Sequence, residues 1–185
     1  CLNYNPNNGE ALKYLGDTYF DLKNYEMSDR YYSALIKNDE NNQMLITRLA
    51  KANFEIGSFS KAAEYGAKIS IRENEQSFEF AFALLKIQKK SEALKIFDDL
   101  LQIKNIQPEI KFQALKAAAE IYYEIAAKYD ARLIGYYEEI LKLINDGVYK
   151  LEDYDFYDSL CLKTARFYFT ITDFPKAYLY YSLLK

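Results

Sequence analysis

Apolar residues recur at helical spacings along almost the whole chain, and alternating strand patterns are absent from the sequence. The three prolines and six glycines in 185 residues are too few for a turn-rich β fold, and they favour long uninterrupted helices. The pattern predicts helices near residues 9–22, 25–37, 41–56, 59–72, 74–88, 91–104, 108–128, 131–145, 153–171 and 174–184. The sequence therefore predicts an all-α fold.

One segment is repeated 34 positions later in the chain. LGDTYFDLKNYEMSDRYYSALI at 15–36 aligns with LAKANFEIGSFSKAAEYGAKIS at 49–70, and residue size is reproduced: Gly16 falls on Ala50 and Phe20 on Phe54. A glycine inside a helix costs about 1 kcal/mol, and closer packing of aromatic side chains can offset that cost. Gly16 is therefore predicted to be a packing contact between two antiparallel helices.

Further copies extend the pattern along the chain. The spacing recurs at 163–184 in KTARFYFTITDFPKAYLYYSLL. Another copy lies at 77–101, three positions earlier than a 34-residue period would place it, and the stretch from Phe112 to Ile144 is a weaker copy. The predicted repeats span 9–42, 43–73, 74–107, 108–147 and 151–185, the fourth being degenerate.

This pattern resembles the tetratricopeptide repeat (TPR) family, whose helix-turn-helix units of about 34 residues alternate small and large side chains in the same way. The resemblance implies a single α-solenoid over 1–185, a right-handed superhelix of antiparallel helix pairs with a concave groove lined by the first helix of each pair. Residues 1–8, with NPNN at 5–8, resemble the tail of a preceding repeat. The departures are the absence of tryptophan, and Asn53 and Gly66 at places where an aromatic residue is usual.

Composition argues against catalysis and against a cofactor or metal ion. The chain has no histidine, its glycines form no phosphate-binding loop, and its acidic pairs are neighbours in sequence that point about 100° apart on a helix. Cys161 lies in an apolar run and is expected to be a small buried hydrophobe. We therefore predict that the protein is not an enzyme and binds no cofactor.

Charge and hydropathy exclude two further classes of partner. The formal net charge of −3, with acids and bases interspersed, provides no basic surface for nucleic acid. The longest apolar stretches, such as FAFALL at 80–85, are far shorter than the ~20 residues of a membrane span.

The TPR resemblance implies which residues face the groove, and their aromatic and charged side chains suit a peptide with apolar anchors and charged flanks. These predicted partner-binding residues are Lys13, Tyr14, Asp17, Phe20, Thr47, Arg48, Lys51, Phe54, Phe78, Glu79, Phe82, Tyr123, Lys163, Arg166 and Phe169. Packing between repeats is the alternative for Phe20, Phe54 and Phe169, which recur at one place in the repeat.

The resemblance also allows one family function to be tested. Members that hold the acidic C-terminus of heat-shock chaperones use lysine, asparagine and arginine at fixed groove places. Here Lys13 matches, but the following places read Asp17, Arg48, Glu75 and Glu79. Because these acids would repel a carboxylate, that function is disfavoured.

The leading hypothesis is a non-catalytic scaffold that binds a peptide segment of another protein, within a bacterial cell-envelope or assembly complex. The alternative is a peptide-sensing regulatory receptor, whose output domain would lie outside this chain. A bacterial origin is inferred from the bias towards lysine, asparagine, isoleucine and tyrosine.

The two ends of the chain carry two further expectations. Cys1 is either a processed lipoprotein start, which implies a lipid anchor and an envelope or periplasmic location, or a fragment boundary in a cytoplasmic protein. The last helix lacks a polar capping helix, so Leu179 and Leu183 are expected to be partly exposed, as a self-association surface or through truncation.

Overall fold

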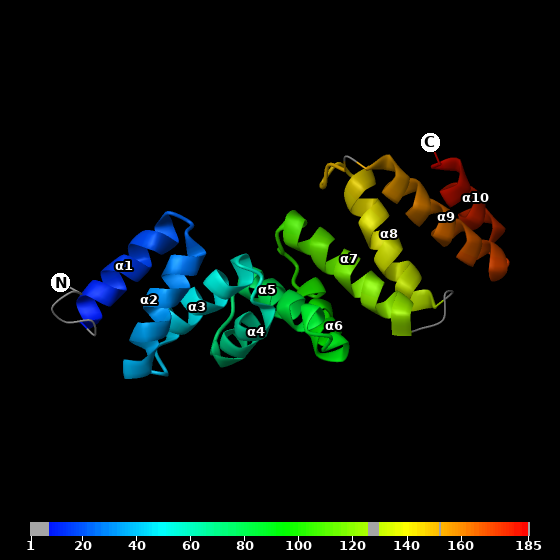
Figure 1. Cartoon of the computed structure of the whole chain (residues 1–185). Helices are drawn as coiled ribbons and strands as arrows, with labels where there is room; N and C mark the ends of the chain where they lie inside the picture. The colour runs from blue at the N-terminus through cyan, green and yellow to red at the C-terminus, as the bar shows by residue number, and fades with distance from the viewer. Residues whose placement is uncertain (1–7, 126–129, 152, 185) are drawn as a thin grey trace. The chain divides into compact units, whose positions relative to one another are not determined.

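The computed structural model describes residues 8–125, 130–151 and 153–184, and within them it is all α-helical, with no strand. A short 3₁₀ helix, η1 (Ile36–Asn38), follows the second α-helix. The α-helices are α1 (Gly9–Asp21), α2 (Tyr25–Leu35), α3 (Gln43–Glu55), α4 (Phe59–Lys68), α5 (Asn74–Lys86), α6 (Lys90–Leu101), α7 (Pro108–Ile125), α8 (Ala131–Asn145), α9 (Tyr154–Thr170) and α10 (Phe174–Ser182), labelled in Figure 1. The predicted fold class is confirmed, and the end of the predicted helix 108–128 lies outside the described residues.

The chain divides into two compact units, Cys1–Ile96 and Phe97–Lys185, here called the N-terminal and C-terminal units. In the N-terminal unit α1 to α5 pack against one another in chain order, and α3 also contacts α5. In the C-terminal unit α7 to α10 do the same. Consecutive antiparallel helices therefore bury each other's apolar faces, while the predicted repeat boundaries and the handedness of the superhelix stay predictions.

Asparagine and aspartate side chains define where many of the helices begin. Asn8, Asn24 and Asn42 accept hydrogen bonds from backbone N–H groups in the first turns of α1, α2 and α3. Asp153 and Asp173 do the same for α9 and α10. Each cap satisfies a backbone donor that the helix itself cannot pair.

Within the described residues, four turns between the two helices of a pair share the same backbone conformation. Lys23, Gly57, Gln88 and Thr172 have positive φ angles of 57°, 75°, 65° and 62°. In each turn this residue donates its N–H to a carbonyl three positions back, and the next residue donates to one five positions back. This is a Schellman motif, and it reverses the chain so that the second helix packs antiparallel to the first.

A glycine and a tyrosine ring form a close contact within the first helix pair. Tyr32 of α2 is fully buried, and a Cβ atom added to Gly16 of α1 would lie 2.6 Å from Cε1 of its ring. The Tyr32 hydroxyl donates a 2.5 Å hydrogen bond to Asp17, and Ser28 of α2 donates one to the Gly16 carbonyl. The predicted packing role of Gly16 is therefore what the structure shows, with Tyr32 as its partner.

In the described part of the chain, an edge-to-face pair of aromatic rings spans the turn in three helix pairs. Phe20 packs on Tyr25 at a centroid distance of 5.4 Å, and the pairs 54/59 and 169/174 repeat the contact at 6.0 and 5.6 Å. Such pairs add about 0.5–1.5 kcal/mol beyond the area they bury. Packing is thus at least one role of Phe20, Phe54 and Phe169.

We expect Gly16→Ala to destabilise the protein by about 1–3 kcal/mol, because its methyl group would overlap a fully buried ring. Gly135→Ala in α8 is the matched control, since a Cβ atom there has nothing within 4 Å. Higher helix propensity should make that variant more stable by about 1 kcal/mol. Urea denaturation measures both, and equal effects of the two substitutions would contradict the packing role of Gly16.

We expect Thr172→Gly to stabilise the protein by about 1 kcal/mol, because a β-branched residue at φ 62° is strained and glycine is not. Gly57→Ala, at φ 75°, should lower the free energy of unfolding by a similar amount. Thermal denaturation of the two variants tests whether both turns have the same conformation. A loss of stability in Thr172→Gly would contradict the positive φ angle at position 172.

Candidate functional site

A cavity of about 270 Å³, here called the α3 cavity, opens in the N-terminal unit between residues of α1, α3, α4 and α5. Its lining combines an apolar interior with a charged rim. The apolar residues are Phe20, Ala50, Phe54, Ala62, Gly66, Ile69 and Phe80. The polar residues are Thr47, Arg48, Lys51, Glu73, Glu75, Gln76 and Glu79.

The α3 cavity lies where the second helix pair lacks the ring that fills the first. Ala50 and Gly66 occupy the places that Gly16 and Tyr32 have 34 positions earlier, so both facing residues are small. Phe80 of the next helix covers Gly66, since a Cβ atom there would lie 2.7 Å from Phe80 Cδ2. The space next to Ala50 stays open and forms part of the cavity.

Arg72 holds the Phe80 ring over Gly66. Its Nε donates a 2.9 Å hydrogen bond to the Gly66 carbonyl, and its guanidinium carbon lies 4.5 Å from the centre of the Phe80 ring. A cation stacked on a ring in this way stabilises its position by about 0.5–1 kcal/mol or more.

Three carboxylates surround a single ammonium group on the rim of the cavity. Lys51 Nζ of α3 lies 3.0 Å from Oε1 of Glu55 and 3.0 Å from Oε1 of Glu75, and it also donates to Glu79. Burial lowers the pKa of Lys51, but the three hydrogen bonds outweigh burial, so its pKa is raised above the ordinary value. Lys51 is therefore a permanent cation, and the cluster keeps an excess of negative charge.

Burial of Glu79 changes its acidity. Only 12% of its side chain is exposed, and this burial raises its pKa above the ordinary value although Lys51 opposes the shift. A cation close to this carboxylate is therefore favourable, because it compensates for lost hydration.

Arg48 is the second cation of the α3 cavity. Its guanidinium carbon lies 4.2 Å from the centre of the Phe20 ring, and its Nη1 lies 3.9 Å from Asp21 Oδ1. Lys13 and Asp17 form a separate ion pair of 2.8 Å on α1. Burial opposes ionisation of Asp17, but the hydrogen bonds from Lys13 and Tyr32 outweigh it and lower its pKa.

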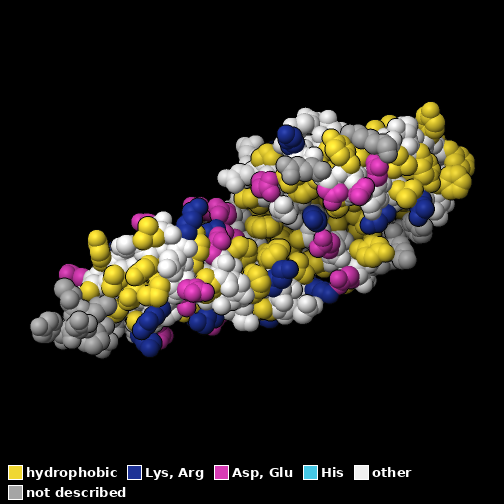
Figure 2. Space-filling model, turned by 45° about the horizontal axis from the view of Figure 1, so that its top comes forward, with side chains coloured by type: hydrophobic (Ala, Val, Ile, Leu, Met, Phe, Trp, Pro, Cys, Tyr) yellow, Lys and Arg dark blue, Asp and Glu magenta, His cyan; other side chains and the backbone are white. Residues whose placement is uncertain are grey.

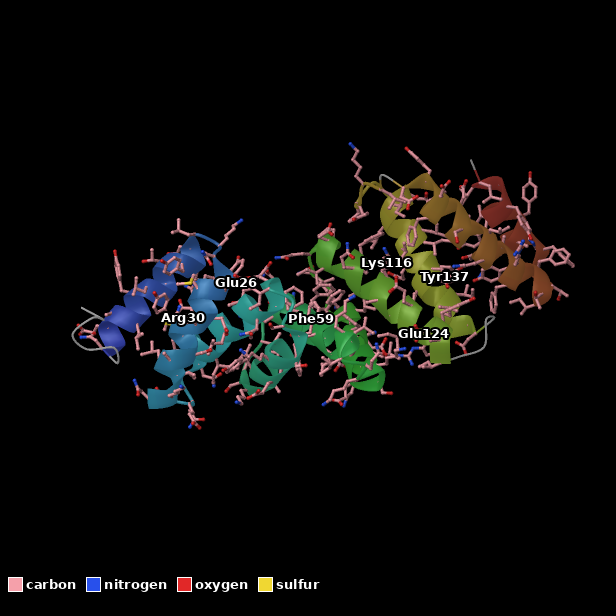
Figure 3. All side chains as sticks on the ribbon, viewed as in Figure 1. Glu26, Arg30, Phe59, Lys116, Glu124 and Tyr137 are labelled. Carbon is pink, nitrogen blue, oxygen red and sulfur yellow. The ribbon has the colours of Figure 1, made fainter. Side chains whose placement is uncertain are left out.

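Phenylalanine rings continue from the cavity wall along α5. Phe82 lies 5.9 Å from Phe54, 6.1 Å from Phe59 and 6.0 Å from Phe78, measured between ring centroids. Phe59 is labelled at the start of α4 in Figure 3. Phe78 and Phe82 are therefore brought next to Phe54, and they belong to a packed aromatic cluster.

A second cavity, of about 320 Å³, lies in the C-terminal unit between α7, α8 and α9. Lys163 Nζ lies 5.7 Å from the Tyr123 ring centre and 5.6 Å from that of Tyr137, and all three residues line this cavity. Lys116 and Glu124 of α7 also line it and are labelled with Tyr137 in Figure 3. Two of the predicted site residues, Tyr123 and Lys163, are thus brought together.

The remaining predicted residues line neither cavity. Tyr14 is 72% exposed on α1, and Phe169 is 58% exposed on α9 beside its ring partner at position 174. Arg166 is exposed on α9. Figure 2 shows hydrophobic side chains reaching the surface beside charged side chains of both signs.

Gly66 and Phe80, which shape the α3 cavity, are among the lining residues that were not predicted as partner-binding residues. Gly66 was visible as a departure from the TPR pattern, and that departure was the signal for a missing ring. Phe80 carried no signal, because its contact with Gly66 joins two helices across a loop.

Among the described residues, no group of histidine, cysteine, aspartate and glutamate side chains is arranged to hold a metal ion. Cys161 is buried, and burial raises the pKa of its thiol, so it is a poor nucleophile. The described helices also include none with the length and hydropathy needed to cross a membrane. Cys1, on which the lipid-anchor expectation rests, lies outside the described residues.

Comparison with solved structures identifies the fold. A crystal structure of MamA matches with a TM-score of 0.65 and 16% identity, covering 94% of this chain and 88% of that chain. YrrB, described as a TPR protein with an unusual peptide-binding site, matches with a TM-score of 0.64 and 8% identity, covering 97% and 86%. The fold is that of the tetratricopeptide repeat.

PilF of Pseudomonas aeruginosa matches the TPR fold of this chain with a TM-score of 0.55 and 17% identity, covering 95% of this chain and 74% of that chain. No protein-family model and no curated protein matches the sequence.

We expect Lys51→Met to destabilise the protein by about 1–3 kcal/mol at pH 7, because it leaves three carboxylates without their common cation. Without that cation the pKa of Glu79 rises further. A carboxyl group whose pKa is raised by folding takes up a proton on folding, so lowering the pH favours the folded state of the variant more than that of wild type. The difference in the free energy of unfolding between Lys51→Met and wild type should therefore shrink as the pH falls towards 4.5, the ordinary pKa of the Glu79 carboxyl group.

Lys13→Met is the control for this measurement, because Lys13 is half exposed and bonds one carboxylate of its own helix. It should cost no more than about 0.5 kcal/mol. Urea denaturation at pH 7 and pH 4.5 compares the variants, and a Lys51→Met deficit that is independent of pH would contradict the cluster.

Proposed function

We propose that this protein is a non-catalytic scaffold that binds a segment of a partner protein along the first helices of its repeats, with the α3 cavity as the main contact. The observation that carries the proposal is that six predicted partner-binding residues, contributed by α1, α3 and α5, line this one cavity. They are Phe20, Thr47, Arg48, Lys51, Phe54 and Glu79.

The size and lining of the α3 cavity favour a protein segment over a small metabolite. A volume of about 270 Å³ is at the lower limit of pockets that enclose a whole small ligand. It suits single side chains projecting from a longer segment that continues over the surface outside. Aromatic walls provide affinity for such anchors, and the charged rim selects among them.

The chemistry of the rim supports binding and not catalysis. Lys51 is held as a cation by its three carboxylate partners, so it cannot serve as a base near neutral pH. Arg48 is engaged by the Phe20 ring and Asp21. These groups are suited to recognising charge.

The TPR fold is compatible with this proposal, since YrrB, which shares the fold, is described as having a peptide-binding site. A place in an envelope complex, a lipid anchor at Cys1 and self-association through α10 stay predictions from the sequence. Tyr178 and Leu179 of α10 are exposed, as the last of these would require.

We expect Thr47→Arg to reduce partner recovery at least about tenfold, because it places a long charged side chain in the lining of the α3 cavity. Ser60→Arg is the matched control, since Ser60 is exposed on α4 and does not line the cavity. The measurement is affinity capture from cell lysate with quantitative mass spectrometry, after circular dichroism has shown equal helicity. Equal recovery by wild type and Thr47→Arg would contradict groove binding.

A further inference from the structure

We propose that the α3 cavity receives an aromatic side chain of the partner, and that a lysine or arginine next to it in the partner sequence binds the acidic rim. This inference rests on the proposed function and names the class of segment that the site selects. Its basis is the comparison of two helix pairs within one chain.

The first helix pair shows what normally fills the space. There the Tyr32 ring lies against Gly16, and its hydroxyl donates a hydrogen bond to the part-buried carboxylate of Asp17 on α1. In the second pair the corresponding places hold Gly66 and Ala50, and no ring of the pair itself occupies them. Because Phe80 already covers Gly66, a ring supplied by a partner would lie against Ala50, the place that corresponds to Gly16 under the Tyr32 ring.

The walls of the cavity favour an aromatic ring over an aliphatic chain. Phe20, Phe54 and Phe80 line it from three different helices, with Phe80 packed on Gly66, and Ala50 provides a small side chain beside the open space. Rings around an open space allow edge-to-face contacts with an incoming ring, each adding about 0.5–1.5 kcal/mol beyond burial. An aliphatic side chain would gain the burial without these contacts.

The charge of the rim selects the residue beside the anchor. Two cations, Arg48 and Lys51, face five carboxylates that line the cavity or bond these cations. The carboxylates belong to Asp21, Glu55, Glu73, Glu75 and Glu79. The excess of negative charge attracts a basic side chain and repels an acidic one.

Two of these acidic residues lie close to the proposed position of the aromatic ring. Glu75 and Glu79 stand one helical turn apart on α5, and both line the cavity in which the ring would sit. Glu75 is largely exposed, so a cation can reach it without displacing Lys51. The anchor and the basic residue therefore bind neighbouring parts of one site and belong to one short segment.

Selection from a random heptapeptide library on the immobilised full chain tests this inference. The expected result is enrichment of peptides with an aromatic residue beside lysine or arginine. Enrichment of acidic or purely aliphatic peptides would overturn the inference and leave the proposed function standing. No enrichment over a blank surface would count against both, and partner capture from lysate then decides whether the proposed function alone survives.

An enriched peptide then serves as the probe in fluorescence anisotropy. Ala50→Leu should weaken its binding at least about tenfold by filling the cavity, whereas Ala67→Leu, on the exposed face of α4, should not. Unchanged binding by a folded Ala50→Leu would overturn the proposed seat of the ring.

A charge cycle tests the rim without altering the interior. Glu75→Gln should weaken the basic peptide about three- to tenfold and leave its glutamine-substituted form unchanged. Equal effects of Glu75→Gln on the two peptides would contradict the rim contact, even if Ala50→Leu failed to fold.

Discussion

The contact between a residue without a side chain and a tyrosine ring is the constraint on which the first helix pair depends. Gly16 lets α2 approach α1 so closely that the Tyr32 ring is fully buried. Interiors of proteins are close-packed, so a single added methyl group at such a contact has no room. The Schellman turn at Lys23 and the ring pair of Phe20 and Tyr25 fix the direction from which α2 makes this approach.

The second helix pair keeps the turn and the ring pair but lacks the central ring. Gly57 has the turn conformation, and Phe54 packs on Phe59 as Phe20 packs on Tyr25. Ala50 and Gly66 are both small, Phe80 covers only Gly66, and a cavity remains between these helices. The α3 cavity therefore arises from a local exception to the packing that builds the first helix pair, and functional sites are expected at such exceptions.

Sequence patterns were sufficient to predict the helices, the fold class and the packing role of Gly16, because these depend on spacing within one repeat. They were insufficient for the charged rim. Lys51 meets carboxylates 24 and 28 positions further along, and this contact depends on how α5 is rotated against α3. The turns at Lys23, Gln88 and Thr172 were equally hard to anticipate, since none of them has the glycine that usually marks a positive φ. The predicted groove residues Tyr14, Arg166 and Phe169 line neither described cavity, because helical register alone does not say where a hollow opens.

A double-mutant cycle between positions 16 and 32 tests the central contact most directly. Tyr32→Leu removes the ring that a methyl group at position 16 would strike, so Gly16→Ala should cost much less in the Tyr32→Leu background than in wild type. The free energies of unfolding should show a coupling of about 1–2 kcal/mol. If the effects of Gly16→Ala and Tyr32→Leu on the free energy of unfolding add within about 0.5 kcal/mol, the contact between Gly16 and the Tyr32 ring is not the constraint on which the first helix pair depends.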